Sequence, residues 1–157
     1  MKIYIYILVI ISIVKIHSQN NYSLENGKIS LILTENWKYG NNVIYNEENE
    51  KVGEKGQGLT EYISGEKFIQ TYKNGFVDDP ETTKFIKSDT LFINGTKWYY
   101  ALRKGEFWDG KGNTGFWYSH NFMRICDSNS FQFVLYNYSG HFDSWMKKIL
   151  NGIKYKK

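Results

Sequence analysis

The chain has 157 residues, of which 41% are hydrophobic and 18% aromatic, with a single cysteine and a formal net charge of +4. This composition excludes an intrinsically disordered chain, because so much apolar side-chain surface is sufficient to build a core, and one cysteine excludes an intramolecular disulfide. Lys2 and Lys15 lie in an N-terminal segment that we expect to be removed, which leaves 18 of the 20 basic residues against 16 acidic ones. So small an excess argues against nucleic acid as a partner.

The first 18 residues have the pattern of an export signal. Lys2 gives a positive start, and the next twelve residues, Ile3–Val14, are apolar apart from one serine and are too short a run to span a bilayer comfortably. Residues 1–18 are therefore predicted to be a signal peptide, and the mature protein to be secreted or periplasmic and free of the membrane. An uncleaved anchor is the alternative, because Lys15 is unusually close to the cleavage point.

Residues 19–157 have the length of one domain with one hydrophobic core. Alternating apolar side chains predict a strand at Ile29–Leu33, and a short apolar run predicts another at Val43–Tyr45. Leu59–Ile63 and Phe68–Tyr72 are rich in β-favouring residues, which predicts a meander. Asp79, followed by proline and glutamate, predicts the start of a short helix.

Two hairpins are predicted in the second half of the chain. Asn94 and Gly95 tolerate positive φ, so they predict a type I′ turn before a strand at Thr96–Arg103, whose apolar residues on both parities indicate cover on both faces. Gly115–Cys126 and Phe131–Tyr138 form the next pair, joined by the polar residues 127–130.

The chain ends on the pattern of an amphipathic helix. Its apolar residues fall at spacings of three and four: Phe142, Trp145, Met146, Ile149, Leu150 and Ile153. Ser139 lies where a cap would be, and Gly152 where the helix would end. The predicted fold class is therefore α+β: an antiparallel sheet of about six strands covered by a C-terminal helix, or an α/β/α sandwich.

Three segments resemble the PsbP and Mog1-like domain family. Ile29–Leu33 followed by Thr34–Trp37 is similar to the family's opening strand and tryptophan loop, and Asn46–Val52 is similar to the next turn. Ser144–Lys154, which reads SWMKKILNGIK, resembles the closing helix. The resemblance implies a non-catalytic α/β/α sandwich that holds other proteins or assemblies, in bacteria often as an exported protein, and it carries over no catalytic residue.

Five aromatic residues surround the polar loop 109–113 and are the candidate binding residues: Phe107, Trp108, Phe116, Trp117 and Tyr118. Aromatic side chains lose little conformational entropy when held, and they can stack on sugars or anchor a protein partner. The alternative is that they close the end of the hydrophobic core.

The sequence predicts no catalytic residue, metal site or cofactor. His120 and Cys126 share strand parity, but six residues of extended chain separate them by about 20 Å. His141 and Asp143 are too few to make a metal ligand set.

The first functional hypothesis is a secreted, non-catalytic binding or accessory module that contacts an unknown protein partner through a sheet edge or the 107–118 region. The second is a carrier of a small ligand, a glycan or a lipid, in an aromatic-lined pocket. The third is an uncharacterised hydrolase. A cavity would favour the carrier, an exposed aromatic patch over a filled core would favour the module, and clustering of a histidine with carboxylates would favour the enzyme.

Overall fold

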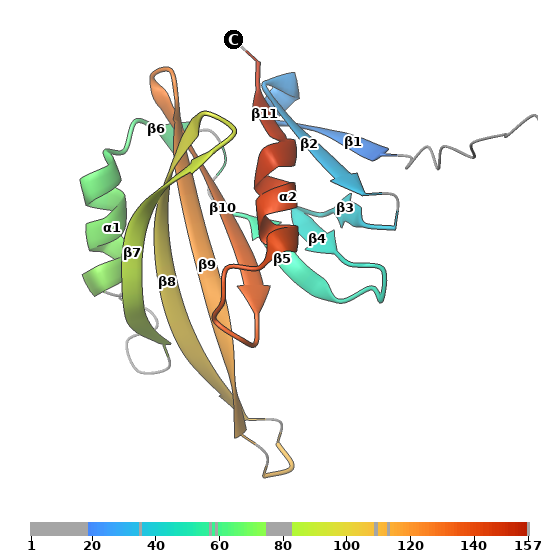
Figure 1. The fold of residues 1–157 in the computed structure, drawn as a ribbon, viewed down its shortest axis with the longest axis vertical. Coiled ribbons are helices and arrows are strands. Elements are labelled where there is room, and N and C mark those ends of the chain that lie inside the picture. The colour runs from blue at the N-terminus through green and yellow to red at the C-terminus, as the bar shows by residue number, and fades with distance from the viewer. Residues whose placement is uncertain are drawn as a thin grey trace, which may run out of the picture.

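The computed structural model describes residues 19–156 except 35, 57, 59, 75–82, 109 and 113, with the backbone alone for Trp108 (Figure 1). The predicted signal peptide and the predicted helix start at Asp79 lie outside these residues. The elements in chain order are β1 Gln19–Leu24, η1 Glu25–Gly27, β2 Ile29–Thr34, β3 Lys38–Gly40, β4 Val43–Tyr45, β5 Lys51–Lys55, β6 Thr60–Glu61, α1 Gly65–Asn74, β7 Thr83–Ile93, β8 Thr96–Trp108, β9 Thr114–Cys126, β10 Asn129–Asn137, α2 Ser144–Gly152 and β11 Ile153–Tyr155. None of the described helices is both long and apolar enough to cross a membrane.

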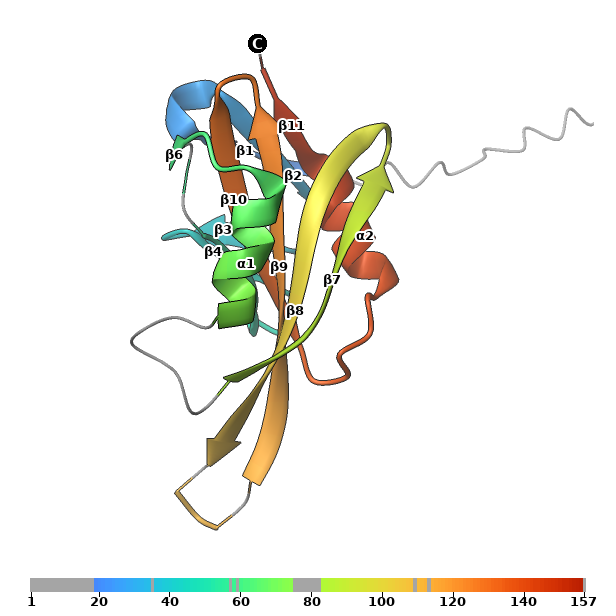
Figure 2. The same ribbon diagram turned by 90° about the vertical axis from the view of Figure 1, so that its left-hand side faces the viewer.

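The described strands form two antiparallel sheets. The large sheet has the order β3-β4-β5-β10-β9-β8-β7, with β6 added alongside β10, and the small sheet has the order β1-β2-β11. Helix α1 packs on one face of the large sheet, while α2 and the small sheet lie over the other (Figures 1 and 2). The central part of the large sheet is therefore covered on both of its faces.

The predicted hairpin at Asn94 and Gly95 is confirmed. Both residues have positive φ, 48° and 73°, and the pair Ile93 and Thr96 closes the turn between β7 and β8. Strand β8 lies between β7 and β9, as its two-sided apolar pattern requires. Trp98 packs in the main core under α2 and the small sheet, and Ala101 packs in a second core under α1.

The predicted fold class is wrong, because the protein is mostly β and has two sheets rather than one sheet of about six strands covered by a C-terminal helix. The predicted helix end at Gly152 is confirmed, because α2 ends there, where a Cβ would lie 2.2 Å from the backbone oxygen of Ile32. The predicted apolar stripe nevertheless included Ile153, which lies beyond that end. Ile153 instead pairs with Leu31 in the small sheet. It is 3% exposed, and a helix or a strand would bury it equally well, so the apolar pattern could not separate the two.

The predicted strand at Phe68–Tyr72 is also wrong, because these residues lie in α1. Phe68 and Tyr72 are four residues apart, so a helix directs both side chains to one face, where they pack on Met123 of β9. The predicted cap at Ser139 is likewise not observed, because Asp143 directly precedes α2.

Candidate functional site

An open groove of about 910 Å³ lies where β5 separates from β10. Among the described residues, β5 pairs with β10 only at Phe133–Leu135, whereas β10 stays paired with β9 as far as Asn137. Lys51, at the start of β5, pairs instead with Tyr45 of β4 across a register shift. The groove therefore occupies the space that a continued ladder between β5 and β10 would have closed.

Six aromatic side chains dominate the walls of this space, which we call the aromatic groove: Trp37, Phe107, Trp117, Tyr136, Tyr138 and Trp145. The remaining walls come from Val52 and the polar residues Asn46, Glu50, Lys51 and Asn137. Apolar surface with a few hydrogen-bonding groups is the usual composition of a binding site.

The paired ends of β8 and β9, residues 104–108 and 114–118, form what we call the β8–β9 arm, and two glycines on it make room for aromatic rings of the groove. A Cβ on Gly105 would lie 2.2 Å from the indole of Trp117, which faces it across the ladder. A Cβ on Gly115 would lie 2.5 Å from the ring of Phe107. Each ring lies over the bare backbone of the glycine opposite it, and the ring centres of Trp117 and Phe107 are 6.0 Å from Tyr136 and 6.4 Å from Tyr138, respectively.

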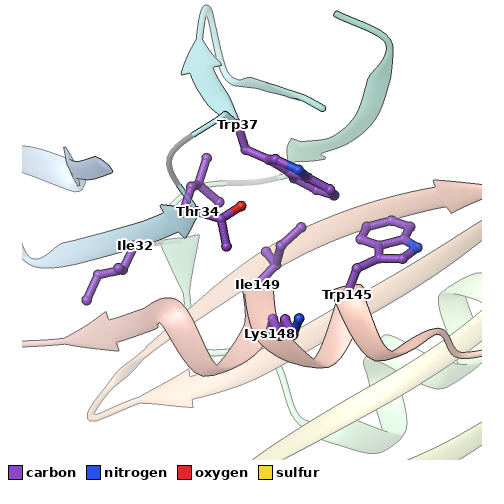
Figure 3. Close-up of a pocket in the computed structure, with 7 residues that line it drawn as sticks. Ile32, Thr34, Trp37, Trp145, Lys148 and Ile149 are labelled. Atoms are coloured by element: carbon purple, nitrogen blue, oxygen red, sulfur yellow. The ribbon is translucent and has the colours of Figure 1, made fainter. Parts of the chain in front are cut away.

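The opposite end of the groove is built by Trp37 and Trp145, whose ring centres are 5.5 Å apart. These two indoles also line a smaller pocket of about 130 Å³ between β2 and α2 (Figure 3). Thr34 and Ile149 point into it, and Lys148 lies at its side (Figure 3). The pocket and the groove thus meet at the tryptophan pair.

Tyr136 is held in place from β5. Its hydroxyl donates to the carboxylate of Glu54, which also accepts from the Lys51 ammonium at 2.8 Å. Burial opposes ionisation of Glu54, but the hydrogen bonds from Lys51 and Tyr136 outweigh it, so the pKa of Glu54 is lowered. Burial and the bond to Glu54 raise the pKa of Tyr136, which therefore stays a neutral donor at ordinary pH.

Asn137, at the groove wall, is held from behind by a buried histidine. Its Oδ1 accepts from the backbone N–H of Gly140, so the His120 Nε2 at 3.1 Å from the same oxygen must carry a proton. The His120 Nδ1 then accepts from the Tyr100 hydroxyl at 2.9 Å. Burial lowers the pKa of His120 despite its bond to Asn137, which agrees with a neutral ring. With both ring nitrogens bonded to protein, His120 positions Asn137.

Asn137 in turn fixes the loop between β10 and α2. Its Nδ2 donates to the His141 backbone oxygen and to the Asp143 carboxylate, both at 2.8 Å. Helix α2 begins one residue later and carries Trp145. The buried Tyr100 and His120 are therefore connected through Asn137 to the position of a groove tryptophan.

Cys126 is 1% exposed, and burial raises the pKa of its thiol, so it behaves as a core residue. In the part of the chain that the structure describes, no three or more histidine, cysteine or carboxylate side chains come together in a way that could hold a metal ion.

The five aromatic residues predicted to bind a partner do not all lie in the groove. Phe107 and Trp117 line the groove. Phe116 points to the other face of the arm, 46% exposed beneath the Lys104 ammonium, and Tyr118 packs against the main core. The side chain of Trp108 lies outside the described residues.

Sequence reasoning missed the other four aromatic residues of the groove. Trp37 was predicted to lie in a loop, and Trp145 was counted with the apolar stripe of the final helix. Tyr136 and Tyr138 belong to the strand predicted at Phe131–Tyr138. Tyr138 is 78% exposed, the highest value among the exposed large hydrophobic side chains that the structure describes, yet no local sequence pattern distinguishes it from its buried neighbours.

No known protein family and no curated protein matches this sequence. Among solved structures, the chain is similar to the solution structure of cyanobacterial PsbP (CyanoP) from Synechocystis sp. PCC 6803, with a TM-score of 0.57 and 13% sequence identity. The similarity covers 91% of this chain and 95% of that one. At this identity it shows a PsbP-like fold and nothing of the function.

Proposed function

We propose that this chain is a non-catalytic binding or accessory module that contacts a protein partner through the aromatic groove. The observation that carries the proposal is the groove itself, with three tryptophans and two tyrosines in its walls. Tryptophan and tyrosine are the residues most enriched in the energetically dominant centres of protein interfaces. The charged residues Glu50 and Lys51 would then form part of a polar rim.

The groove is a better contact site than the β7 edge of the large sheet. The edge strand β7 carries the exposed residues Lys84 and Lys87 and has a register shift between Phe85 and Lys87. Charged side chains and bulges at an edge oppose the addition of another strand. We therefore place the partner in the groove, and we propose that the module is exported, as residues 1–18 predict.

A non-catalytic role is consistent with how the buried histidine is used. Both nitrogens of His120 are bonded to Tyr100 and Asn137, so neither is available to a substrate. We therefore do not propose a hydrolase.

The proposal is tested by cross-linking the protein in its own cells and measuring the masses of the complexes by native mass spectrometry. Tyr138→Ala and Trp117→Ala should each reduce a reproducible cross-linked complex at least fivefold. Tyr62→Ala is the matched control, because Tyr62 is 57% exposed against 78% for Tyr138 and does not line the groove. Equal loss in all three variants, or in none, would contradict the proposal.

A ligand carrier is the second candidate, favoured by the volume of the groove, which lies within the range of small-molecule sites, roughly 300–1,000 Å³. A small molecule bound to the wild-type protein in the same spectra, and absent from Trp117→Ala, would favour the carrier over the module.

A further inference from the structure

We infer that the small pocket beside Trp37 and Trp145 receives an apolar side chain from an extended segment of the partner protein, and that an acidic residue next to it pairs with Lys148. This inference rests on the proposed function, because the same partner would continue into the aromatic groove.

The size and lining of the pocket suit one apolar side chain. Its volume is about 130 Å³, and its lining includes Leu33, Ile149 and the two indoles. A cavity of roughly 150 Å³ is large enough to hold a benzene ring. The present pocket is slightly smaller, so it suits a leucine side chain, whereas a whole peptide does not fit.

The charge beside the pocket selects the residue next to that apolar side chain. Lys147 and Lys148 are both exposed on α2, and Lys148 lines the pocket (Figure 3). The ion pairs found among the described residues are Lys51–Glu54 and Lys55–Glu25, so no described carboxylate lies within 4.0 Å of either α2 ammonium group. A carboxylate of the partner would complement this charge, and its pairing would strengthen as the interface excludes water.

The connection between pocket and groove argues for a polypeptide. Trp37 and Trp145 line both spaces, so an occupant of the pocket can continue directly into the groove. There it would meet β10 at Tyr136 and Asn137, on the side where no ladder with β5 forms among the described residues. An extended peptide can use such a strand edge for main-chain hydrogen bonds while an adjacent pocket selects a side chain.

The test uses the full chain labelled with 5-fluorotryptophan, which gives one fluorine NMR signal for each of its five tryptophans. Three synthetic peptides are titrated: GSGLDDGSG, GSGLKKGSG and GSGSDDGSG. Only the first combines an apolar side chain with acidic neighbours. It should shift the signals of Trp37 and Trp145 and leave the fully buried Trp98 unchanged. Lys148→Glu should weaken its binding about fivefold or more, whereas Lys67→Glu on the exposed face of α1 should not.

The other outcomes separate this inference from the proposed function. Equal binding of the leucine-lysine peptide, an unchanged affinity in Lys148→Glu, or no shift of any tryptophan signal would overturn the inference. Shifts confined to Trp117 would also overturn it, while leaving the groove as a contact site. A fourth titration uses octanoate, a fatty acid that also carries an apolar group and a carboxylate but is not a peptide. If octanoate binds more tightly than the first peptide, the peptide assignment is wrong and the carrier is favoured.

Discussion

The indole rings of Trp37 and Trp145 pack with their centres 5.5 Å apart, although one follows β2 and the other lies in the first turn of α2. This contact joins the N-terminal and C-terminal parts of the described chain. It also forms the boundary between the aromatic groove and the small pocket. The tryptophan pair is therefore both a packing contact and a part of the candidate site.

Trp145→Ala should lower the free energy of unfolding by about 2 kcal/mol, less than a fully buried tryptophan would, because Trp145 is half-buried. Trp145→Phe keeps an aromatic ring against Trp37 and should lose about 1 kcal/mol or less. Urea unfolding followed by circular dichroism measures both. Equal losses in the two variants would show that the ring contact adds no stability.

The stability of the protein should fall between pH 7.5 and 5.5 because of His120. Burial lowers the pKa of His120 in the folded state, so the unfolded chain takes up its proton first as the pH falls through about 6.5. This contribution is complete above that pH and is lost progressively below it, by up to about 1.4 kcal/mol per pH unit. It ends when the pH passes the folded-state pKa.

The measurement is urea unfolding of the wild type and His120→Gln at both pH values, with a smaller pH slope expected in the variant. The lowered pKa of Glu54 acts only at more acidic pH, so it does not enter this window. Leu135→Ala is the control, because Leu135 pairs with His120 across the ladder and does not titrate. A variant slope as steep as that of the wild type would refute the assignment to His120.

Gly95→Ala should cost about 1–2 kcal/mol of stability, because Gly95 has a φ of 73° and an L-residue is strained there. A Cβ at this position has no atom within 4 Å, so the loss would be purely conformational. Gly40→Ala is the matched control, since a Cβ there is equally free of contacts and its φ is not positive. Thermal unfolding should show a lower midpoint for Gly95→Ala alone.

Gly152→Ala should be the more damaging glycine substitution, by about 3 kcal/mol, because its Cβ would lie 2.2 Å from the backbone oxygen of Ile32. Backbone cannot rotate away as a side chain can, so α2 would have to move off β2. The fluorine signal of Trp145 should shift as the pocket widens. An unchanged signal together with wild-type stability would mean that α2 adjusts at no cost.

Particular residues show how far the sequence could predict this fold. Asn94 and Gly95 determine their turn locally, through the φ angles that they tolerate, and that hairpin is confirmed. Phe68 and Tyr72 are β-favouring residues, yet α1 forms there because it buries both side chains against the sheet. Gly152 is the predicted end of the last helix and is its observed end, whereas Ile153 would be buried in either secondary structure, so only its pairing with Leu31 shows that it belongs to a strand.

The candidate site could be predicted only in part, because local sequence does not record which distant segments pack together. Phe107 and Trp117 share a face of one arm, so local sequence could single them out, but their neighbour Phe116 points away from the groove. Trp37 and Trp145 come together only when the small sheet and α2 pack over the large one.

By itself, the sequence determined the turn at Asn94 and Gly95, the strands of the second half of the chain, the end of the last helix at Gly152 and the concentration of aromatic residues near the β8–β9 arm. These properties depend on φ preferences and on the spacing of apolar side chains, which act over a few residues. The tertiary structure alone decided the second sheet, the separation of β5 from β10 and the groove between them. These depend on which surfaces pack together across the whole chain, and periodicity records that a residue is buried but not what it is buried against.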